Sequence, residues 1–216
     1  MMRPPVLFLV DVDNTLLDND QVVADLMRYL EETIGHDCQR QYWEIFTRLR
    51  EELGYADYLG ALQRYRALHR RDPNVLSVSS FLINYPFADR LFPRALEAIA
   101  DLRSAGPVVI LSDGDVVFQP HKIERSGLRD AVDGVLIYVH KELELDDVER
   151  RYPADRYVFI DDKLRLLAAV KAAWDGRVTT VFPRQGHYAL DPENLRRYPA
   201  ADVTIEAIGE LVGWRH

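Results

Sequence analysis

The stretch Val6-Leu7-Phe8-Leu9-Val10-Asp11-Val12-Asp13-Asn14-Thr15-Leu16 joins an apolar run to two acidic residues. The run from Val6 to Val10 has the composition of a strand buried on both faces, which is typical of a parallel sheet. In extended chain, residues i and i+2 point the same way, so Asp11 and Asp13 can serve one site. Binding crevices in open α/β sheets lie at the carboxyl ends of strands, where this pair falls. A solvated Asp/Asn turn is the alternative interpretation of this segment alone.

Length and composition indicate a globular protein. The chain has 216 residues, of which 48% are hydrophobic and 29% are charged, which suits one domain or one domain with a large insertion. A net charge of −8 argues against nucleic acid as a partner, because phosphate backbones require basic patches. A metal ion and a few lysines can still reverse the sign locally, so an anionic small molecule remains compatible.

Other features of the sequence predict a cytoplasmic protein. The only cysteine is Cys38, so no disulfide can form within the chain. No apolar stretch is long enough to cross a bilayer, and the first residues lack a signal-peptide pattern. We therefore expect no membrane partner. The sequence does not determine the oligomeric state.

Further strand-like runs cover residues 108–111, 135–139, 157–160 and 178–182, and helical patterns lie between most of them. Strands that alternate with helices predict an α/β fold with a Rossmann-like parallel sheet and helices on both faces.

The interval 18–90 differs, because it contains no convincing strand. It shows three or four helical patterns, and Val22, Leu26 and Leu30 form one of the apolar stripes. A crossover between parallel strands usually contains one helix, so this length predicts an inserted all-helical cap at 18–90. The core would then comprise residues 1–17 plus 91–216. Trp43, Tyr55 and Tyr58 in the insertion are explained at least as well by core packing as by substrate contact.

Polar side chains follow three later strands. Ser112-Asp113-Gly114 can offer a hydroxyl and backbone N–H groups to an anion, Lys141 can offer an ammonium, and Asp161-Asp162 can hold a hard cation such as Mg²⁺. Each has an ordinary alternative, namely a turn, a solvated lysine and a helix cap respectively. Their order along successive strand ends is more informative than any one of them.

Together these segments resemble the four motifs of the haloacid dehalogenase-like hydrolases. The order of strands and helices and the helical insertion after the first motif are also similar, so the resemblance covers nearly the whole chain. Most members of this superfamily are Mg²⁺-dependent phosphohydrolases. The resemblance therefore implies an enzyme that hydrolyses a small phosphorylated metabolite, a phosphomonoester, through an aspartyl-phosphate.

The resemblance also implies roles for individual residues. Asp11 would attack phosphorus, and Asp13 would protonate the leaving oxygen and then deprotonate the attacking water. Ser112 and Lys141 would hold phosphate oxygens, with Asp113 beside them in the substrate site. Asp162, Asp11 and the backbone carbonyl of Asp13 would bind Mg²⁺, and Asp161 would assist directly or through water.

Several assignments stay open at this stage. Lys122 and Lys163 compete with Lys141 for the phosphate-binding role, but only Lys141 directly follows a strand-like run. Some members carry another acid four or five residues after the metal aspartate, where this chain has Leu166 and Leu167. His187, in a predicted loop after the last strong strand, could approach the pocket, although a surface-loop histidine is the simpler interpretation.

Three alternative functions remain. One is a metal-independent 2-haloacid dehalogenase, which would need neither Asp13 nor the acidic pair at 161–162. The second is a phospho-acceptor signalling domain, which would be shorter and would carry its acceptor aspartate after a later strand. The third is a non-catalytic interaction protein on the same scaffold, and the intact set of charged groups argues against it.

Overall fold

The structure is a computed structural model that describes residues 3–215. Residues 1–2 and 216, which the predicted core includes, lie outside the described part. Within it, six strands form one parallel sheet in the order β3-β2-β1-β4-β5-β6. The strands are β1 (Val6–Val10), β2 (Val108–Asp113), β3 (Gly134–Tyr138), β4 (Arg156–Ile160), β5 (Val178–Pro183) and β6 (Val203–Ile205). The predicted α/β, Rossmann-like class is confirmed. The short edge strand β6 is not predicted, because only Ile205 in it is buried.

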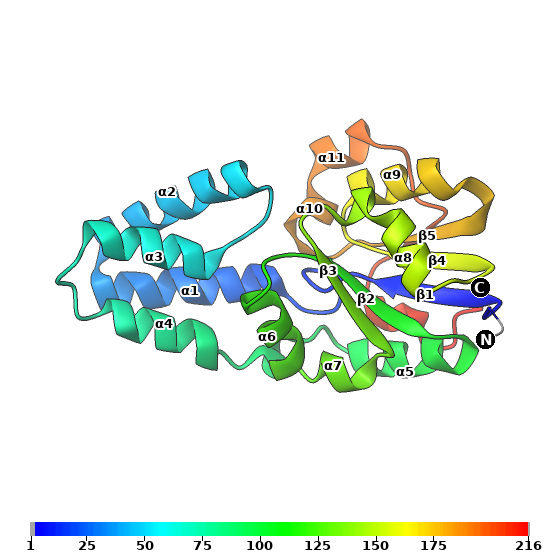
Figure 1. Ribbon diagram of the computed structural model, residues 1–216, viewed down its shortest axis with the longest axis horizontal. Coiled ribbons are helices and arrows are strands. Elements are labelled where there is room, and N and C mark those ends of the chain that lie inside the picture. The colour runs from blue at the N-terminus through cyan, green and yellow to red at the C-terminus, as the bar shows by residue number, and fades with distance from the viewer. Residues whose placement is uncertain (1–2, 216) are drawn as a thin grey trace.

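Helices cover both faces of the sheet (Figure 1), and the side chains of β1 alternate between two core layers. Phe8 and Val10 pack with α5 (Ala95–Ala105), α6 (Phe118–Arg125) and α7 (Leu128–Ala131). Leu7 and Leu9 pack with α8 (Leu145–Arg151), α9 (Leu164–Trp174) and α10 (Gly186–Leu190). The remaining short helices are η2 (Lys141–Leu143), η3 (Asp175–Arg177), α11 (Pro192–Arg197) and η4 (Ile208–Leu211). Across residues 3–215, no helix combines the length and apolarity needed to cross a membrane.

A separate helical segment, residues 19–90, extends from one end of the sheet (Figure 1). It comprises α1 (Asn19–Ile34), α2 (His36–Leu53), α3 (Tyr58–Leu68), α4 (Val75–Asn84) and the short helix η1 (Phe87–Arg90). The two chain crossings into the core lie side by side, because Leu17 and Leu91 form an antiparallel bridge and the Asp18 N–H donates to the Arg90 carbonyl at 2.8 Å. The helical segment therefore leaves and rejoins the core at one point, just after the carboxyl end of β1.

A buried carboxylate stabilises the base of this segment. Asp25 of α1 accepts hydrogen bonds from the Tyr85 hydroxyl at 2.5 Å and from Arg90 at 3.0 Å, and it also binds Arg28 and Gln21. Burial opposes the charge of Asp25, but these donors outweigh it and lower its pKa. The network ties the first helix of the segment to its last turn.

Candidate active site

The loop after β1 brings the ends of β1 and β4 together. Asn14 has φ of +60°, a left-handed conformation that asparagine tolerates better than most side chains. The hydroxyl of Thr15 accepts a hydrogen bond from the Asp162 N–H at 3.1 Å. Gly186 lies so close to Asn14 that a Cβ there would collide with it. These contacts hold the acidic residues of both strand ends in one place.

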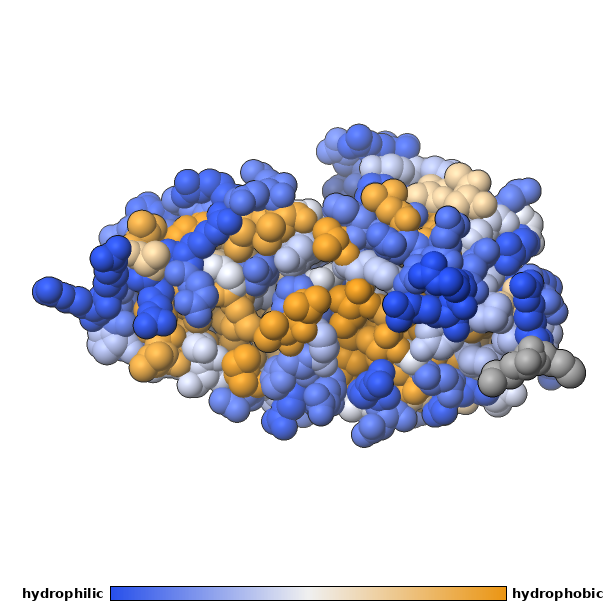
Figure 2. All heavy atoms as spheres, in the orientation of Figure 1, coloured by the Kyte–Doolittle hydropathy of each residue, from blue (hydrophilic) through white to orange (hydrophobic). Residues whose placement is uncertain are grey.

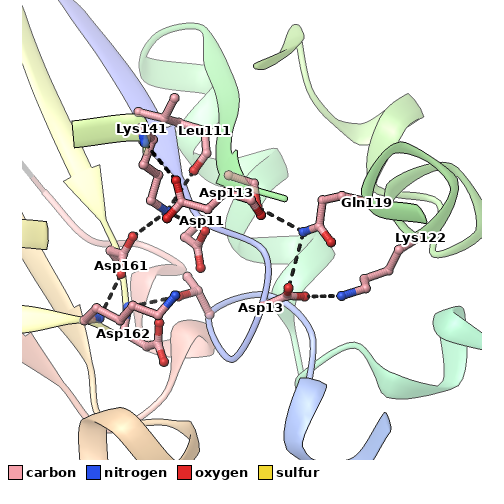
Figure 3. Close-up of polar contacts among 12 residues, drawn as sticks. Asp11, Asp13, Leu111, Asp113, Gln119, Lys122, Lys141, Asp161 and Asp162 are labelled. Atoms are coloured by element: carbon pink, nitrogen blue, oxygen red, sulfur yellow. Dashed lines mark hydrogen bonds and ion pairs between the residues drawn. The ribbon is translucent and has the colours of Figure 1, made fainter. Parts of the chain in front are cut away.

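Three carboxylates form a buried cluster at this point (Figure 3). Oxygen atoms of Asp11, Asp161 and Asp162 lie within 4.8 Å of one another, and their residues are no more than 2% exposed. Within the described residues, Oδ2 of Asp11 and both carboxylate oxygens of Asp162 have no hydrogen-bond partner. Buried acceptors without partners are costly, and these oxygens could hold a cation.

Lys141 supplies part of the positive charge. Its Nζ lies 2.5 Å from Asp11 Oδ1, 2.6 Å from Asp161 Oδ2 and 3.1 Å from the Leu111 carbonyl. Burial opposes the charge on Lys141, but Asp11 and Asp161 outweigh it and raise its pKa. Lys141 is therefore an ammonium at neutral pH.

The ammonium groups of Lys141 and Lys163 do not balance three acids. Burial raises the pKa of Asp161 to about 6, with Lys141 opposing the shift. Burial also raises the pKa of Asp162, opposed chiefly by Lys163, the residue just before α9. A group whose ionisation is this unfavourable in the metal-free protein is typical of a functional site.

Asp13 lies apart from the cluster (Figure 3). Its carboxylate accepts a hydrogen bond from Lys122 Nζ at 2.7 Å and a long one from Gln119 Nε2 at 3.4 Å. Lys122 is 1% exposed and also donates to Asn19 Oδ1 at 2.9 Å. Two acids only two residues apart thus have different surroundings, Asp11 beside Lys141 and Asp13 beside Lys122.

Ser112 and Asp113 occupy the last two positions of β2. The Ser112 hydroxyl accepts a hydrogen bond from Gln119 Nε2 at 2.9 Å. Asp113 Oδ1 accepts from the backbone N–H of Lys141 at 2.8 Å, which fixes the start of η2. Burial raises the pKa of Asp113, with Lys141 opposing. Asp113 thus holds Lys141 in place, in addition to lining the cavity described next.

A cavity of about 670 Å³ lies between the helical segment and the core. Asp13, Asp113 and Asp162 line its core side, and α1 and α2 line the other. His187 is exposed, as expected of a surface residue, but it lies in the short helix α10 rather than in a loop. It lines the cavity, and its Nδ1 is 2.6 Å from Asp20 Oδ1 in α1. The Tyr188 hydroxyl next to it contacts Arg50 of α2. α10 therefore joins the core to the helical segment across the cavity.

Comparison with known proteins identifies the family. A family model for haloacid dehalogenase-like hydrolases matches residues 6–173. A haloacid dehalogenase-like hydrolase from Burkholderia xenovorans LB400 shares 61% identity with this chain over 99% of it and 100% of the other, with a TM-score of 0.94. The chain belongs to the haloacid dehalogenase-like hydrolase family. No match was found among curated proteins.

More distant structures share the fold of this haloacid dehalogenase-like hydrolase. YfnB from Bacillus subtilis, a HAD-hydrolase bound to magnesium, is 20% identical, covers 98% of each chain and has a TM-score of 0.62. L-2-haloacid dehalogenase from Xanthobacter autotrophicus is 18% identical, covers 97% of each chain and has a TM-score of 0.64. A magnesium-bound hydrolase and a haloacid dehalogenase thus share this fold, so the fold alone does not identify the reaction.

The structure of this hydrolase brings the sequence-predicted residues to one end of the sheet. Asp11, Asp161, Asp162 and Lys141 are in direct contact or close proximity, while Asp13 and Ser112 meet at Gln119. Three further polar contributors were not assigned these contacts from sequence: Gln119, Lys122 and Asn19. A signal for the first two exists, because both fall on the buried face of α6 with Phe118 and Ile123.

The cluster fits a magnesium ion. Carboxylate oxygens are the ligands that Mg²⁺ prefers, and here they are buried, close together and partly without donors. Both oxygens of Asp162 are free for it, and Asp11 could contribute Oδ1, the oxygen that contacts Lys141. Asp161 is occupied by Lys141 and by the Lys163 N–H at 2.8 Å. The Asp13 carboxylate is turned toward Lys122 instead of toward the cluster.

Proposed function

We propose that this protein is a Mg²⁺-dependent phosphohydrolase that cleaves a small phosphomonoester through an aspartyl-phosphate. The observation that carries the proposal is the buried cluster of Asp11, Asp161 and Asp162, which has more negative charge than Lys141 and Lys163 together offset. Displacement of halide from carbon by a carboxylate needs no metal site. Transfer of an anionic phosphoryl group to a carboxylate does need cations, because like charges must approach each other.

Asp11 is the nucleophile in this scheme. Its Oδ1 is held by Lys141 while Oδ2 has no hydrogen-bond partner, so Oδ2 is free to form the new bond to phosphorus. Lys141 and the Ser112 hydroxyl bind non-bridging phosphate oxygens. When bound by Asp11, Asp162 and the Asp13 carbonyl, Mg²⁺ would supply charge stabilisation for the transferring group.

Asp13 moves the proton. In the first step it gives a proton to the alcohol oxygen as the P–O bond breaks. In the second step it takes a proton from the water that attacks the aspartyl-phosphate, which regenerates Asp11 and releases phosphate. The side chain of Asp13 is 27% exposed and lines the cavity, so it can reach the leaving alcohol.

The helical segment acts as a cap in this proposal. Its α1 and α2 form one wall of the cavity, so substrate has to fit between cap and core. Enclosure excludes water and favours small substrates over macromolecules.

Phosphate release from a panel of sugar phosphates, nucleotides, phospho-acids and aryl phosphates tests this function. We expect Mg²⁺-dependent release from at least one ester, with EDTA abolishing it. Asp11→Asn should lower kcat by at least about 10³-fold, since it removes the nucleophile. Asp146→Asn is the matched control, because Asp146 is exposed on α8.

The same preparation distinguishes the alternatives. Metal-independent halide release from a 2-haloacid, with no phosphate release, would replace this proposal with a dehalogenase. Inactivity in both assays, together with no Mg²⁺-dependent change in thermal unfolding, would indicate a non-catalytic protein.

A further inference from the structure

The cap side of the cavity has an apolar wall that the phosphate chemistry does not use. Val23, Ala24 and Met27 of α1 and Trp43 and Phe46 of α2 line it. Of these five, only Phe46 is fully buried. On the face shown in Figure 2, hydrophobic residues also gather where the helical segment meets the core. Apolar side chains left open around a cavity are typical of ligand-binding grooves.

The wall begins at the catalytic end and continues away from it. Asn19, Val23 and Met27 recur every fourth residue on one face of α1, and all three line the cavity. Asn19 touches Lys122, the partner of Asp13. At 1.5 Å per residue, Met27 lies about 12 Å further along the helix axis than Asn19.

Polar groups are concentrated near the catalytic end of this path. Asn19 and Asp20 lie at the start of α1, and Arg50 lies one turn beyond Phe46 on α2, in contact with Tyr188 of the core. Trp43 lies one turn before Phe46 on α2, on the side away from Arg50, and stacks on Phe46 with ring centroids 4.8 Å apart. The cavity therefore changes from polar to apolar with distance from Asp13.

We propose that the preferred substrate is a phosphomonoester whose alcohol ends in an aromatic ring system. The inference rests on the proposed phosphatase reaction, because Asp13 then places the leaving alcohol at the foot of α1. The distal ring packs against Trp43 and Met27, since flat rings stack on indole and thioether sulfur contacts aromatic rings favourably. A cavity of about 670 Å³ has room for a phosphate ester with an aromatic alcohol, whereas a three-carbon haloacid would leave most of it empty.

Binding tests this subsite without turnover. In an Asp11→Asn protein with Mg²⁺, isothermal titration calorimetry should show that 2-naphthyl phosphate binds about tenfold more tightly than phenyl phosphate, because the second ring buries more apolar area. Trp43→Ala should reduce this ratio to below about threefold. Met27→Glu places a charge in the apolar wall and should likewise reduce the ratio of the two affinities. Leu76→Ala is the control, because Leu76 is 71% exposed on α4 and does not line the cavity.

The outcomes separate the subsite from the reaction. Equal affinity for the two aryl esters, a ratio unchanged by Trp43→Ala and Met27→Glu, or tighter binding of a linear alkyl phosphate overturns the aromatic subsite. A different outcome is that Asp11→Asn binds 2-naphthyl phosphate preferentially but the wild type releases no phosphate. That result overturns the proposed phosphatase reaction and leaves the subsite in place.

A separate observation concerns Lys122, which is buried outside the four sequence motifs. We infer that it is a positioning residue that fixes the Asp13 carboxylate toward the leaving group. Its Nζ bridges Asp13 and Asn19 at 2.7 and 2.9 Å, so it connects the proton-transfer group to the first residue of the cap. Gln119, one turn earlier on α6, contacts the second oxygen of Asp13 at 3.4 Å.

The dependence of rate on the leaving group tests this role, which also rests on the proposed reaction. A poor leaving group needs proton transfer from Asp13, whereas 4-nitrophenolate leaves with little help. Lys122→Met should lower kcat/KM for an alkyl phosphate by about 100-fold and for 4-nitrophenyl phosphate by less than about fivefold. Lys122→Arg should restore part of the alkyl phosphate activity.

Lys122→Gln keeps a hydrogen-bonding side chain and replaces the methionine variant if that protein does not fold. Equal losses for both esters, in a wild type that hydrolyses both, would show a purely structural role for Lys122 and leave the proposed reaction in place.

Discussion

Replacing Asp162 by asparagine separates the stability of the metal-free protein from its response to Mg²⁺. Asp162 is fully buried, both of its oxygens lack hydrogen-bond partners among residues 3–215, and Asp11 and Asp161 are its neighbours. Asparagine has the same shape without the charge. We therefore expect the variant to be more stable than the wild type in EDTA, and to lose most of its stabilisation by Mg²⁺.

The magnitude follows from burial and from mass action. An uncompensated buried charge costs several kcal/mol, and Lys163 and Lys141 offset part of it, so we expect Asp162→Asn to stabilise the metal-free protein by about 1–2 kcal/mol. For a domain of this size that is roughly 2–8 °C in Tm. Mg²⁺ at 100 times its Kd should add about 2.7 kcal/mol to the wild type.

Thermal unfolding followed by circular dichroism, with EDTA and with a Mg²⁺ titration, measures both effects. Asp146→Asn is again the control and should behave as the wild type in both conditions. A lower Tm for Asp162→Asn in EDTA, or a Mg²⁺ response with an unchanged midpoint, would refute the view that these acids form a cation site.

Four further predictions concern charge and stability. Asp25→Ala should destabilise the protein by about 2–3 kcal/mol in urea unfolding, because it leaves the Tyr85 hydroxyl and Arg90 without their buried acceptor; an unchanged midpoint would contradict this. The pKa of Asp25 is lowered from 3.8, so its stabilising contribution is present above about pH 4 and is lost as pH falls through its folded-state pKa. The difference in unfolding free energy between the wild type and Asp25→Asn should therefore become smaller over that pH range. The contribution of Asp161 to stability changes with pH in the opposite direction, because its pKa is raised to about 6. The metal-free wild type should therefore gain stability from this group as pH falls through 6. Lys141→Met should destabilise the metal-free protein at pH 7 and abolish phosphate release, and a variant as stable as the wild type in EDTA would show that Lys141 does not offset the acid cluster.

Much of the fold follows from local sequence pattern. Apolar runs such as Val6–Val10 predict strands buried on both faces, and the stripe of Val22, Leu26 and Leu30 predicts a helix whose buried side is already visible in the sequence. Edge strand β6 is missed because a three-residue strand with one buried side chain carries too little periodicity. Its place in the sheet is determined by pairing with β5, which is a contact between distant segments.

The candidate site likewise has one part that the sequence predicts and one part that only the tertiary structure decides. The sequence places Asp11, Asp13, Ser112, Lys141 and the pair at 161–162 at or near the ends of strand-like runs, and parallel strands end at one edge of the sheet. The resemblance to the four family motifs then implies their roles. Only the tertiary structure decides that Lys141 pairs with Asp11 while Lys122 pairs with Asp13. These ion pairs span 130 and 109 residues. The local sequence shows which residues carry charge and which face of a strand or helix they occupy. The partner of each charge is instead determined by packing between helices and strands that are far apart in the chain.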